Sequence, residues 1–353
     1  MEFDKKDVLK IYSRLADDDS KEIFGLRVLY NLTDDFEYMA QIIRKVAPKS
    51  LLVELQERIA KINKKDVVYY GCGKDATIIR ILCPDVRMEL MCDRDVNKQK
   101  NGFNGLKVLS PDELYSIKDV EVVVTSSMYH EEIVSELTQK GKIDKSRIDD
   151  LGDILDGMNH TLYKTQYFEE GIVSPIDDEI FIDGGCFNCN TDVLFSEWTN
   201  GQYKKIYAFE PDDVNYEGCL EAIKKEKLKN VEVINAGVWS EDTTLSFVAD
   251  HGQGAKVGEG TNTITINAKS IDSVVEDDRV TFIKLDVEGS ELEALHGAKN
   301  TILKNRPRLA ICLYHKPEDI VEIPAYILSL IPDYKIYIRH YQLSKNETIM
   351  YAI

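Results

Sequence analysis

The chain has 353 residues, with 44 Lys and Arg against 62 Asp and Glu, which gives a formal net charge of −18 at pH 7. At roughly 150 residues per domain, this length predicts two domains with separate cores. The negative charge disfavours nucleic acid and anionic membrane surfaces as partners, because both are themselves negatively charged.

The composition also bears on where the protein works. No stretch approaches the roughly 20 apolar residues of a membrane span, and the first residues, MEFDKKDVLK, lack the apolar segment of a signal peptide. The seven cysteines are odd in number and scattered, which suits reduced thiols better than a disulfide framework. We therefore expect a cytoplasmic protein without a membrane span.

In the first half, residues 1–64 are expected to form a helical cap. Apolar residues recur there at intervals of three and four, as in Val8, Ile11 and Leu15, which is the spacing of one helix face. From 65 to 150, short apolar runs alternate with helical spacing, and this alternation predicts a small parallel-sheet domain. Residues 151–178 contain glycines and a proline, and we expect them to form a linker.

The second half, residues 179–353, repeats the alternation of strands and helices. Apolar runs predict strands at 179–183, 205–209, 231–235, 280–286, 308–314 and 334–340. Within 237–268, TTLSFVAD and TITINA alternate apolar and polar residues, which predicts a two-stranded ribbon. The last two strands, YKIYIRHYQ and ETIMYAI, predict a terminal antiparallel hairpin. The expected fold class is therefore α/β, with two Rossmann-like domains and a helical N-terminal cap.

Polar residues follow successive strands of the second half. In EIFIDGGCFNCNT, Asp183 ends a strand, Gly184 and Gly185 form the turn, and Thr191 lies where a helix begins. Glycines let backbone N–H groups approach a nucleotide-like ligand at such a turn. About 20 residues later a strand ends at Glu210, a position from which a carboxylate can accept hydrogen bonds from both ribose hydroxyls.

Two further strand ends complete this pattern. One strand ends at Asn235 and Ala236, where an adenine edge can meet an amide or a backbone group, and another ends at Asp286, two residues before Glu288. The carboxyl ends of parallel strands share one edge, so the four strand ends are expected to face one crevice.

The run from FIDGGCFNCNT through AFEPD and NAGVWS to FIKLDVEGSELEALHGAKNTI resembles the FkbM-type family of S-adenosylmethionine-dependent methyltransferases, over roughly 180–353. LDVEGSELEALHGA is its most specific part. The resemblance implies a seven-stranded methyltransferase sheet with S-adenosylmethionine as cofactor. It also implies a cofactor site made of Asp183, Gly184, Gly185, Cys186, Asn188, Thr191, Glu210, Pro211, Asn235, Ala236 and Asp286.

The first loop departs from the pattern D-G-G-A-x-D-G-D-T that is common in this family. Asp183 is retained, whereas Cys186, Asn188, Cys189 and Asn190 replace the alanine, the next aspartate, the last glycine and the last aspartate. Cys186 and Cys189 form a C-x-x-C, but no second cysteine pair lies at zinc spacing, so packing within the loop is favoured over metal binding.

The segment VVYYGCGKDATIIRIL and the residues after it resemble small Rossmann-type domains attached to enzymes of bacterial surface-sugar assembly. Gly71, Gly73 and Ala76 satisfy G-x-G-x-x-[GA], and Asp93 ends the next strand about 17 residues on. For this glycine loop, binding of a nucleotide or nucleotide-sugar and a purely structural role are about equally expected. A dehydrogenase is disfavoured, since no catalytic Lys, Tyr or His constellation accompanies the glycines.

The leading hypothesis is O-methylation of a sugar hydroxyl in a bacterial glycan, glycolipid or nucleotide-sugar. His315 or Asp286 would remove the proton, with Glu288 beside them, because a histidine pKa near neutrality suits this role. A divalent ion held by these three residues is conceivable, though nothing requires it, and Glu291 is interpreted as a solvated helix charge. The alternative is a catalytically silent module that binds S-adenosylmethionine or a nucleotide-sugar. The acceptor and homo-oligomer formation stay open.

Overall fold

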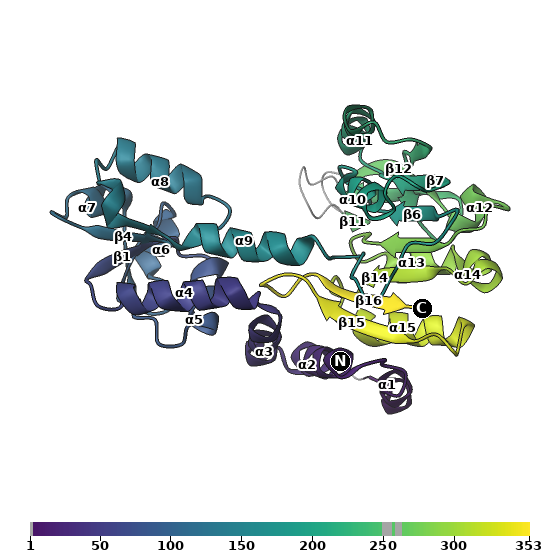
Figure 1. Ribbon diagram of the computed structural model, residues 1–353, viewed down its shortest axis with the longest axis horizontal. Helices are drawn as coiled ribbons and strands as arrows, with labels where there is room; N and C mark the ends of the chain where they lie inside the picture. Colours follow the sequence, from purple (N-terminus) through teal and green to yellow (C-terminus); the bar gives the residue numbers. More distant parts are fainter. Residues whose placement is uncertain (1–2, 249–255, 258–262) are drawn as a thin grey trace. The chain divides into compact units, whose positions relative to one another are not determined.

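The computed structural model describes residues 3–248, 256–257 and 263–353. The chain divides into two compact units (Figure 1). Unit 1 contains Met1–Tyr38, Thr165–His340 and Lys345–Ile353, and unit 2 contains Met39–Lys164 and Tyr341–Ser344.

Unit 2 is built on a five-stranded parallel sheet with the order β3-β2-β1-β4-β5. Its strands are β1 (Val67–Tyr70), β2 (Leu90–Cys92), β3 (Lys107–Leu109), β4 (Glu121–Val124) and β5 (Ile148–Asp150). Alternate residues of β1 enter two different apolar clusters, Tyr69 on one face and Val68 and Tyr70 on the other. Both faces of this sheet are therefore covered, as a parallel sheet requires.

The helices that accompany this sheet alternate with its strands along the chain. They are α3 (Phe36–Val46), which crosses the boundary between the units, α4 (Lys49–Ile62), α5 (Lys74–Leu82), α6 (Val96–Asn101), α7 (Pro111–Tyr115), α8 (His130–Gln139) and α9 (Leu151–Tyr163), with a 3-10 turn at Lys145–Arg147.

Unit 1 contains a seven-stranded sheet with the order β15-β16-β14-β13-β6-β7-β8. Its strands are β6 (Ile180–Gly184), β7 (Lys205–Phe209), β8 (Val231–Ile234), β13 (Phe282–Leu285), β14 (Arg308–Cys312), β15 (Ile336–His340) and β16 (Thr348–Ala352). β16 pairs antiparallel with both β14 and β15, whereas the other pairs are parallel. The predicted α/β class and terminal hairpin are confirmed.

The helices of unit 1 follow the same alternation. They are α1 (Lys5–Tyr12), α2 (Asp18–Thr33), α10 (Asn190–Trp198), α11 (Asp213–Glu226), α12 (Ile271–Val275), α13 (Glu291–His296), α14 (Lys299–Asn305) and α15 (Asp319–Leu330).

The predicted ribbon forms a small second sheet. β10 (Thr243–Val248) and β12 (Thr263–Lys269) pair antiparallel. β11 (Lys256–Val257) joins β10, and β9 (Gly237–Val238) runs parallel to β12. Because β9 follows β8 after two residues, this sheet begins next to the edge strand of the larger one.

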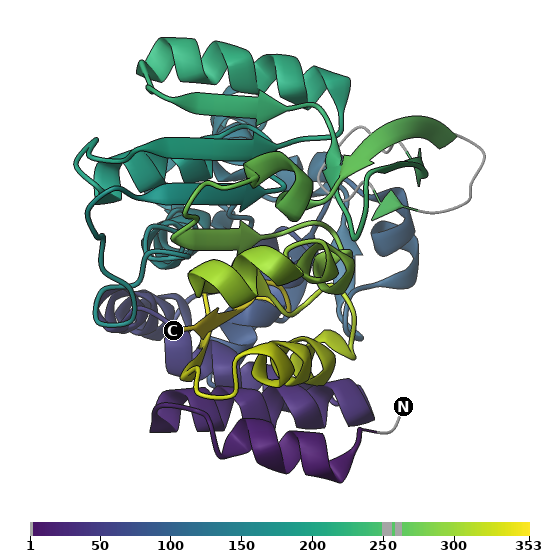
Figure 2. The same ribbon diagram turned by 90° about the vertical axis from the view of Figure 1, so that its right-hand side faces the viewer.

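The helices expected as one cap over 1–64 are divided between the units. α1 and α2 lie against α15 and β15 in unit 1 (Figure 2). Ile336 donates to the carbonyl of Arg14 and accepts from Ala16, so this N-terminal segment covers the edge of β15. An edge strand left open would offer unpaired backbone groups to other chains. Coverage of this edge gives a physical reason why α1 and α2 belong to unit 1.

The segment expected as a linker, 151–178, begins with helix α9. Leu151, Ile154, Leu155 and Met158 are buried, at the spacing of one helix face. Gly152 and Gly157 lie within this helix, and because glycines favour turns they led to the prediction of a linker. Gly152 is required by close packing, because a Cβ there would lie 2.2 Å from the carbonyl oxygen of Ser126.

Candidate functional site

The carboxyl ends of β6, β7, β8 and β13 share one edge of the seven-stranded sheet, since these strands are parallel neighbours. The register places Gly184 beside Leu285 on one side and beside Phe209 on the other. The structure therefore brings together the loops that begin at Gly185, Glu210 and Asp286.

The glycine loop after β6 lies very close to β13. Gly185 has a φ of +78°, and a Cβ there would lie 2.0 Å from the carbonyl oxygen of Asp286, so this position accepts only glycine. A Cβ on Gly184 would lie 2.6 Å from Leu285 Cδ2. The N–H groups of Gly185 and Cys186 both donate to the carbonyl of Phe209, at 3.1 and 3.0 Å. These two donors bind the neighbouring strand and do not face a ligand.

Glu210 closes the same loop from the end of β7. Its Oε2 accepts from the N–H of Phe187 at 3.0 Å, and its Oε1 accepts from the N–H of Asp212 at 2.9 Å. The side chain is 5% exposed, and burial raises the pKa of Glu210 to about 7. Asn215 Nδ2 also donates to Oε1, at 3.5 Å. Three donors thus contact this carboxylate, and its remaining acceptor position is on Oε2.

The remaining residues predicted to bind the cofactor differ in how much of each is exposed to solvent. Asn235 is exposed and donates to Asp213 Oδ1 at 2.7 Å, whereas Ala236 is buried. Asn188 is exposed, and its Oδ1 accepts from the N–H of Asn190 at 3.1 Å, so it shapes the start of α10. Thr191 is buried in that helix, and Pro211 is partly buried.

Asp183 forms a buried ion pair across the two central strands. Lys284 donates from Nζ to Asp183 Oδ1 at 2.7 Å and to the carbonyl of Gly185 at 2.8 Å. Asp183 is fully buried, and its Oδ2 has no hydrogen-bond partner among the described residues. Burial raises the pKa of Asp183, while the charge of Lys284 opposes that shift. The unpartnered oxygen marks Asp183 as an acceptor available to a ligand.

Asp286 receives two tyrosine hydroxyls at the end of β13. Tyr314 donates to Oδ1 and Tyr167 to Oδ2, both at 3.0 Å. Burial by itself would raise the pKa of Asp286, but the charges of Lys284 and His315 and the Tyr167 hydroxyl outweigh it and hold the pKa below its usual value. Asp286 is therefore ionised at neutral pH.

His315 lies among three carboxylates. Its Nδ1 is 2.8 Å from Glu291 Oε1, and its Nε2 is 3.5 Å from both Asp286 Oδ1 and Glu288 Oε2. Burial lowers its pKa, but the hydrogen bond and the three negative charges outweigh burial and raise the pKa of His315 to about 9. The imidazole is thus protonated at neutral pH, and the prediction of a histidine pKa near neutrality is wrong.

Glu291 is fully buried and is not the solvated helix charge that its helical position predicted. Its Oε1 also accepts from the N–H groups of Val287 and Gly289. Ligand atoms of Asp286, Glu291 and His315 all lie within 4.8 Å of one another. In this group of potential metal ligands, Glu291 takes the place expected for Glu288.

Four residues of this site carried no predicted role. Lys284 had a detectable signal, because a lysine inside the apolar strand FIKL must be paired when it is buried. Glu291 and Tyr314 lie next to predicted residues along the chain, but their direction depends on helix and strand geometry. Tyr167 lies in the segment expected as a linker, and only the tertiary structure brings it to Asp286.

The glycine loop of unit 2 does bring its predicted residues together. The N–H of Cys72, between Gly71 and Gly73, donates to Asp93 Oδ2 at 2.7 Å, and Lys98 Nζ lies 3.2 Å from the same oxygen. Gly71 has a φ of +121°, and a Cβ there would lie 2.8 Å from Thr125 Oγ1. Ligand binding at this loop stays a prediction.

Two features concern the chain as a whole. All seven cysteines are free and buried, as expected for reduced thiols. Across the ranges that the structure describes, we find no helix with the length and apolar character of a membrane span.

The comparisons with known proteins bear on residues 180–353. Residues 184–336 match the profile of the methyltransferase FkbM domain. The fold is similar to that of methyltransferase FkbM from Methylobacillus flagellatus, with a TM-score of 0.51 and 21% identity over 85% of this chain and 93% of that chain. An rRNA methylase from Streptococcus thermophilus gives a TM-score of 0.33 and 17% identity over 56% of this chain and 93% of that chain.

No curated protein matches the sequence. The resemblance of unit 2 to domains of surface-sugar enzymes is not tested by these matches and stays a prediction. The profile match and the similar fold confirm the resemblance of the second half. Residues 184–336 therefore match a methyltransferase FkbM domain, in a chain whose fold is similar to that of a methyltransferase FkbM.

Proposed function

We propose that the chain is an S-adenosylmethionine-dependent O-methyltransferase that acts on a sugar hydroxyl of a glycan, a glycolipid or a nucleotide-sugar. The FkbM domain supports methyl transfer. The single observation that carries the chemistry is the ionised Asp286, which two tyrosine hydroxyls hold beside His315 at the carboxyl edge of the sheet. A carboxylate with neighbouring hydroxyls suits recognition of a neutral polyol by hydrogen bonds.

The residues of the glycine loop fit the cofactor. Asp183 offers a buried oxygen without a partner among the described residues, and Glu210 offers its remaining acceptor position to a ribose. When bound, S-adenosylmethionine supplies a methyl group on a cationic sulfur that departs as a neutral thioether. The acidic edge formed by Asp183, Asp286 and Glu288 favours such a cation by charge.

Asp286 is the group best placed to accept a proton. As the acceptor oxygen bonds to the methyl carbon and the carbon–sulfur bond breaks, the hydroxyl proton passes to the Asp286 carboxylate. Alignment of the acceptor does most of the work, because the methyl group is already activated. His315 is a protonated neighbour whose charge keeps Asp286 ionised. Of the two candidate bases, Asp286 is therefore preferred over His315.

The silent binding module remains the second candidate because of one observation. The N–H groups of Gly185 and Cys186 are engaged with Phe209, so the loop offers a ligand fewer donors than a glycine turn usually does. Binding of the cofactor and its turnover must therefore be measured separately.

The experiment combines calorimetric titration with S-adenosylhomocysteine and transfer of labelled methyl from S-adenosylmethionine to a panel of sugars and nucleotide-sugars. Asp286→Asn should retain binding and lose methyl transfer by about 100-fold or more, while the exposed control Asp277→Asn should keep both. Binding without transfer to any acceptor would favour the silent module. Absence of S-adenosylhomocysteine binding would refute the methyltransferase and would leave a silent module that binds a nucleotide-sugar.

A further inference from the structure

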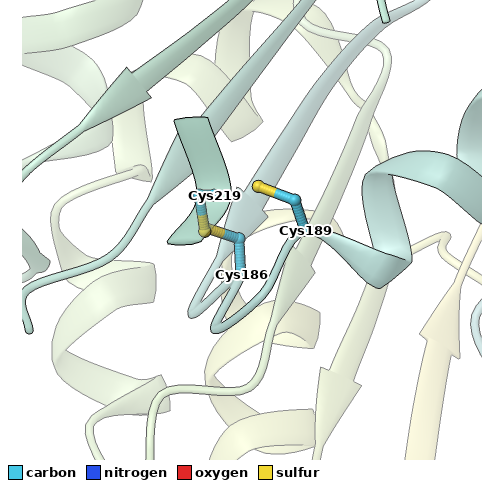
Figure 3. A group of neighbouring side chains, drawn as sticks. All are labelled: Cys186, Cys189 and Cys219. Atoms are coloured by element: carbon cyan, nitrogen blue, oxygen red, sulfur yellow. The ribbon is translucent and has the colours of Figure 1, made fainter. Parts of the chain in front are cut away.

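Three buried cysteines meet beneath the glycine loop of the methyltransferase domain (Figure 3). Cys186 follows the loop glycines, Cys189 begins α10, and Cys219 comes from α11. The sulfurs of Cys186 and Cys219 are 3.6 Å apart, and all three lie within 4.8 Å of one another. Helix α11 thus brings a third cysteine to the C-x-x-C pair, although this cysteine is distant from the pair along the sequence.

The spacing of the sulfurs suits a tetrahedral metal. With Zn–S bonds of about 2.3 Å, two thiolates on one zinc ion lie roughly 3.8 Å apart, close to the separation of Cys186 and Cys219. A disulfide would require about 2.05 Å.

A buried carboxylate next to the cluster provides a second observation. Asp192 is fully buried, and neither of its oxygens has a hydrogen-bond partner among the described residues. A buried carboxylate without a partner is costly unless it is neutralised, and a cation at the thiols would provide that neutralisation.

We propose that Cys186, Cys189 and Cys219 bind one thiophilic divalent cation, zinc in the first place, and that Asp192, which lies in the helix capped by Cys189, completes the ligand set. Binding releases the thiol protons to solvent and forms three metal–sulfur bonds, with no change in oxidation state. Phe187 and Asn188, which lie between Cys186 and Cys189 along the chain, are exposed.

The cation would fix the loop to α11. The Cys219 thiol already donates to the carbonyl of Phe187 at 3.3 Å, and the N–H of Phe187 donates to Glu210. Metal binding would replace the Cys219 thiol hydrogen bond by a metal–sulfur bond and would join Cys219 of α11 to Cys186 and Cys189 of the loop. The inference concerns metal binding and does not depend on the proposed methyl transfer.

The first test uses the full wild-type chain, reduced and freed of metal, and titrated with Co²⁺. We expect one ion per chain, a thiolate-to-cobalt charge-transfer band, and displacement by Zn²⁺. The zinc K-edge absorption spectrum of the loaded protein should show about three sulfur neighbours near 2.3 Å. Because these measurements need no variant, a wild-type chain without the band or without sulfur neighbours would overturn the proposal.

The second test assigns the ligands. Cys219→Ala should weaken Zn²⁺ binding by at least about 100-fold, because one thiolate is lost, and Asp192→Asn should weaken it less. Cys83→Ala removes a buried cysteine of unit 2 and serves as the matched control, with binding unchanged. Equal binding by Cys219→Ala and wild type would overturn the assignment. A chain that takes up no metal but loses two thiols to hydrogen peroxide would indicate a disulfide pair and also overturn it.

Discussion

Lys284 donates a hydrogen bond of 2.7 Å from Nζ to Oδ1 of Asp183, and the two side chains are 2% and 0% exposed. The pair joins the two central strands and also holds the carbonyl of Gly185, so it fixes the loop that carries the proposed cofactor site. Burial would lower the pKa of Lys284, but the charges of Asp183 and Asp286 reverse this and keep the amine protonated.

Replacing Lys284 by Met should lower the free energy of unfolding by about 3–5 kcal/mol, because Asp183 would remain buried without a partner. Urea unfolding measures this loss. Lys304→Met is the control, since Lys304 forms an exposed ion pair with Asp277, and its removal should leave stability nearly unchanged. Similar stabilities for the two variants would show that the buried pair contributes little.

The stability of unit 1 should fall as pH rises through the titration of His315. Its pKa is about 9 in the folded chain, against 6.5 as the ordinary value. A raised pKa stabilises the fold fully below about pH 6.5 and loses that contribution as pH passes 9, a change of roughly 3 kcal/mol. Urea unfolding of wild type and His315→Gln between pH 6 and pH 10 should therefore converge at high pH.

The titration itself can be observed by NMR of the imidazole ring. The midpoint of His315 should lie near pH 9 and should fall in Glu291→Gln, which removes the charge hydrogen-bonded to Nδ1. A midpoint at or below 6.5 in the wild type would contradict this charge arrangement and would restore His315 as a candidate base.

Gly185→Ala should lower stability and cofactor binding by more than the penalty of placing alanine in a left-handed backbone conformation. Gly201 has a φ of +70° with nothing within 4 Å of a built Cβ, so Gly201→Ala carries only the conformational penalty of roughly 1–2 kcal/mol. In Gly185→Ala the new Cβ also meets the carbonyl of Asp286. We expect a larger loss of stability and at least about tenfold weaker binding of S-adenosylhomocysteine by calorimetry. Equal effects would mean that the loop can move away from β13.

Tyr167 is expected to be a positioning residue for Asp286. Its hydroxyl helps to hold the Asp286 pKa low, so Tyr167→Phe should move the acidic limb of the kcat/KM profile upward by roughly one pH unit. Tyr207→Phe removes a similar tyrosine–aspartate hydrogen bond to Asp278 on another part of the sheet and should leave the profile in place. An unmoved limb in Tyr167→Phe would argue against Asp286 as the titrating group.

The sequence by itself determined most of the order of strands and helices, the resemblance of the second half to FkbM methyltransferases, and the strand ends at which Asp183, Glu210 and Asp286 meet. Helix α9, which lies in the segment expected as a linker, was not predicted. The predicted features are local, since hydrophobic spacing and glycine turns are written in consecutive residues. The direction of parallel strands then brings their carboxyl ends to one edge.

Only the tertiary structure decided what surrounds those strand ends. Tyr167 and Cys219 reach the site from a predicted linker and a separate helix, and Glu291 is buried by the packing of α13 against the loop before it. The charge of His315 depends on carboxylates that converge through these contacts. Such effects depend on distance and burial in space, because charge interactions strengthen when side chains leave water, and neither quantity can be read from spacing along the chain.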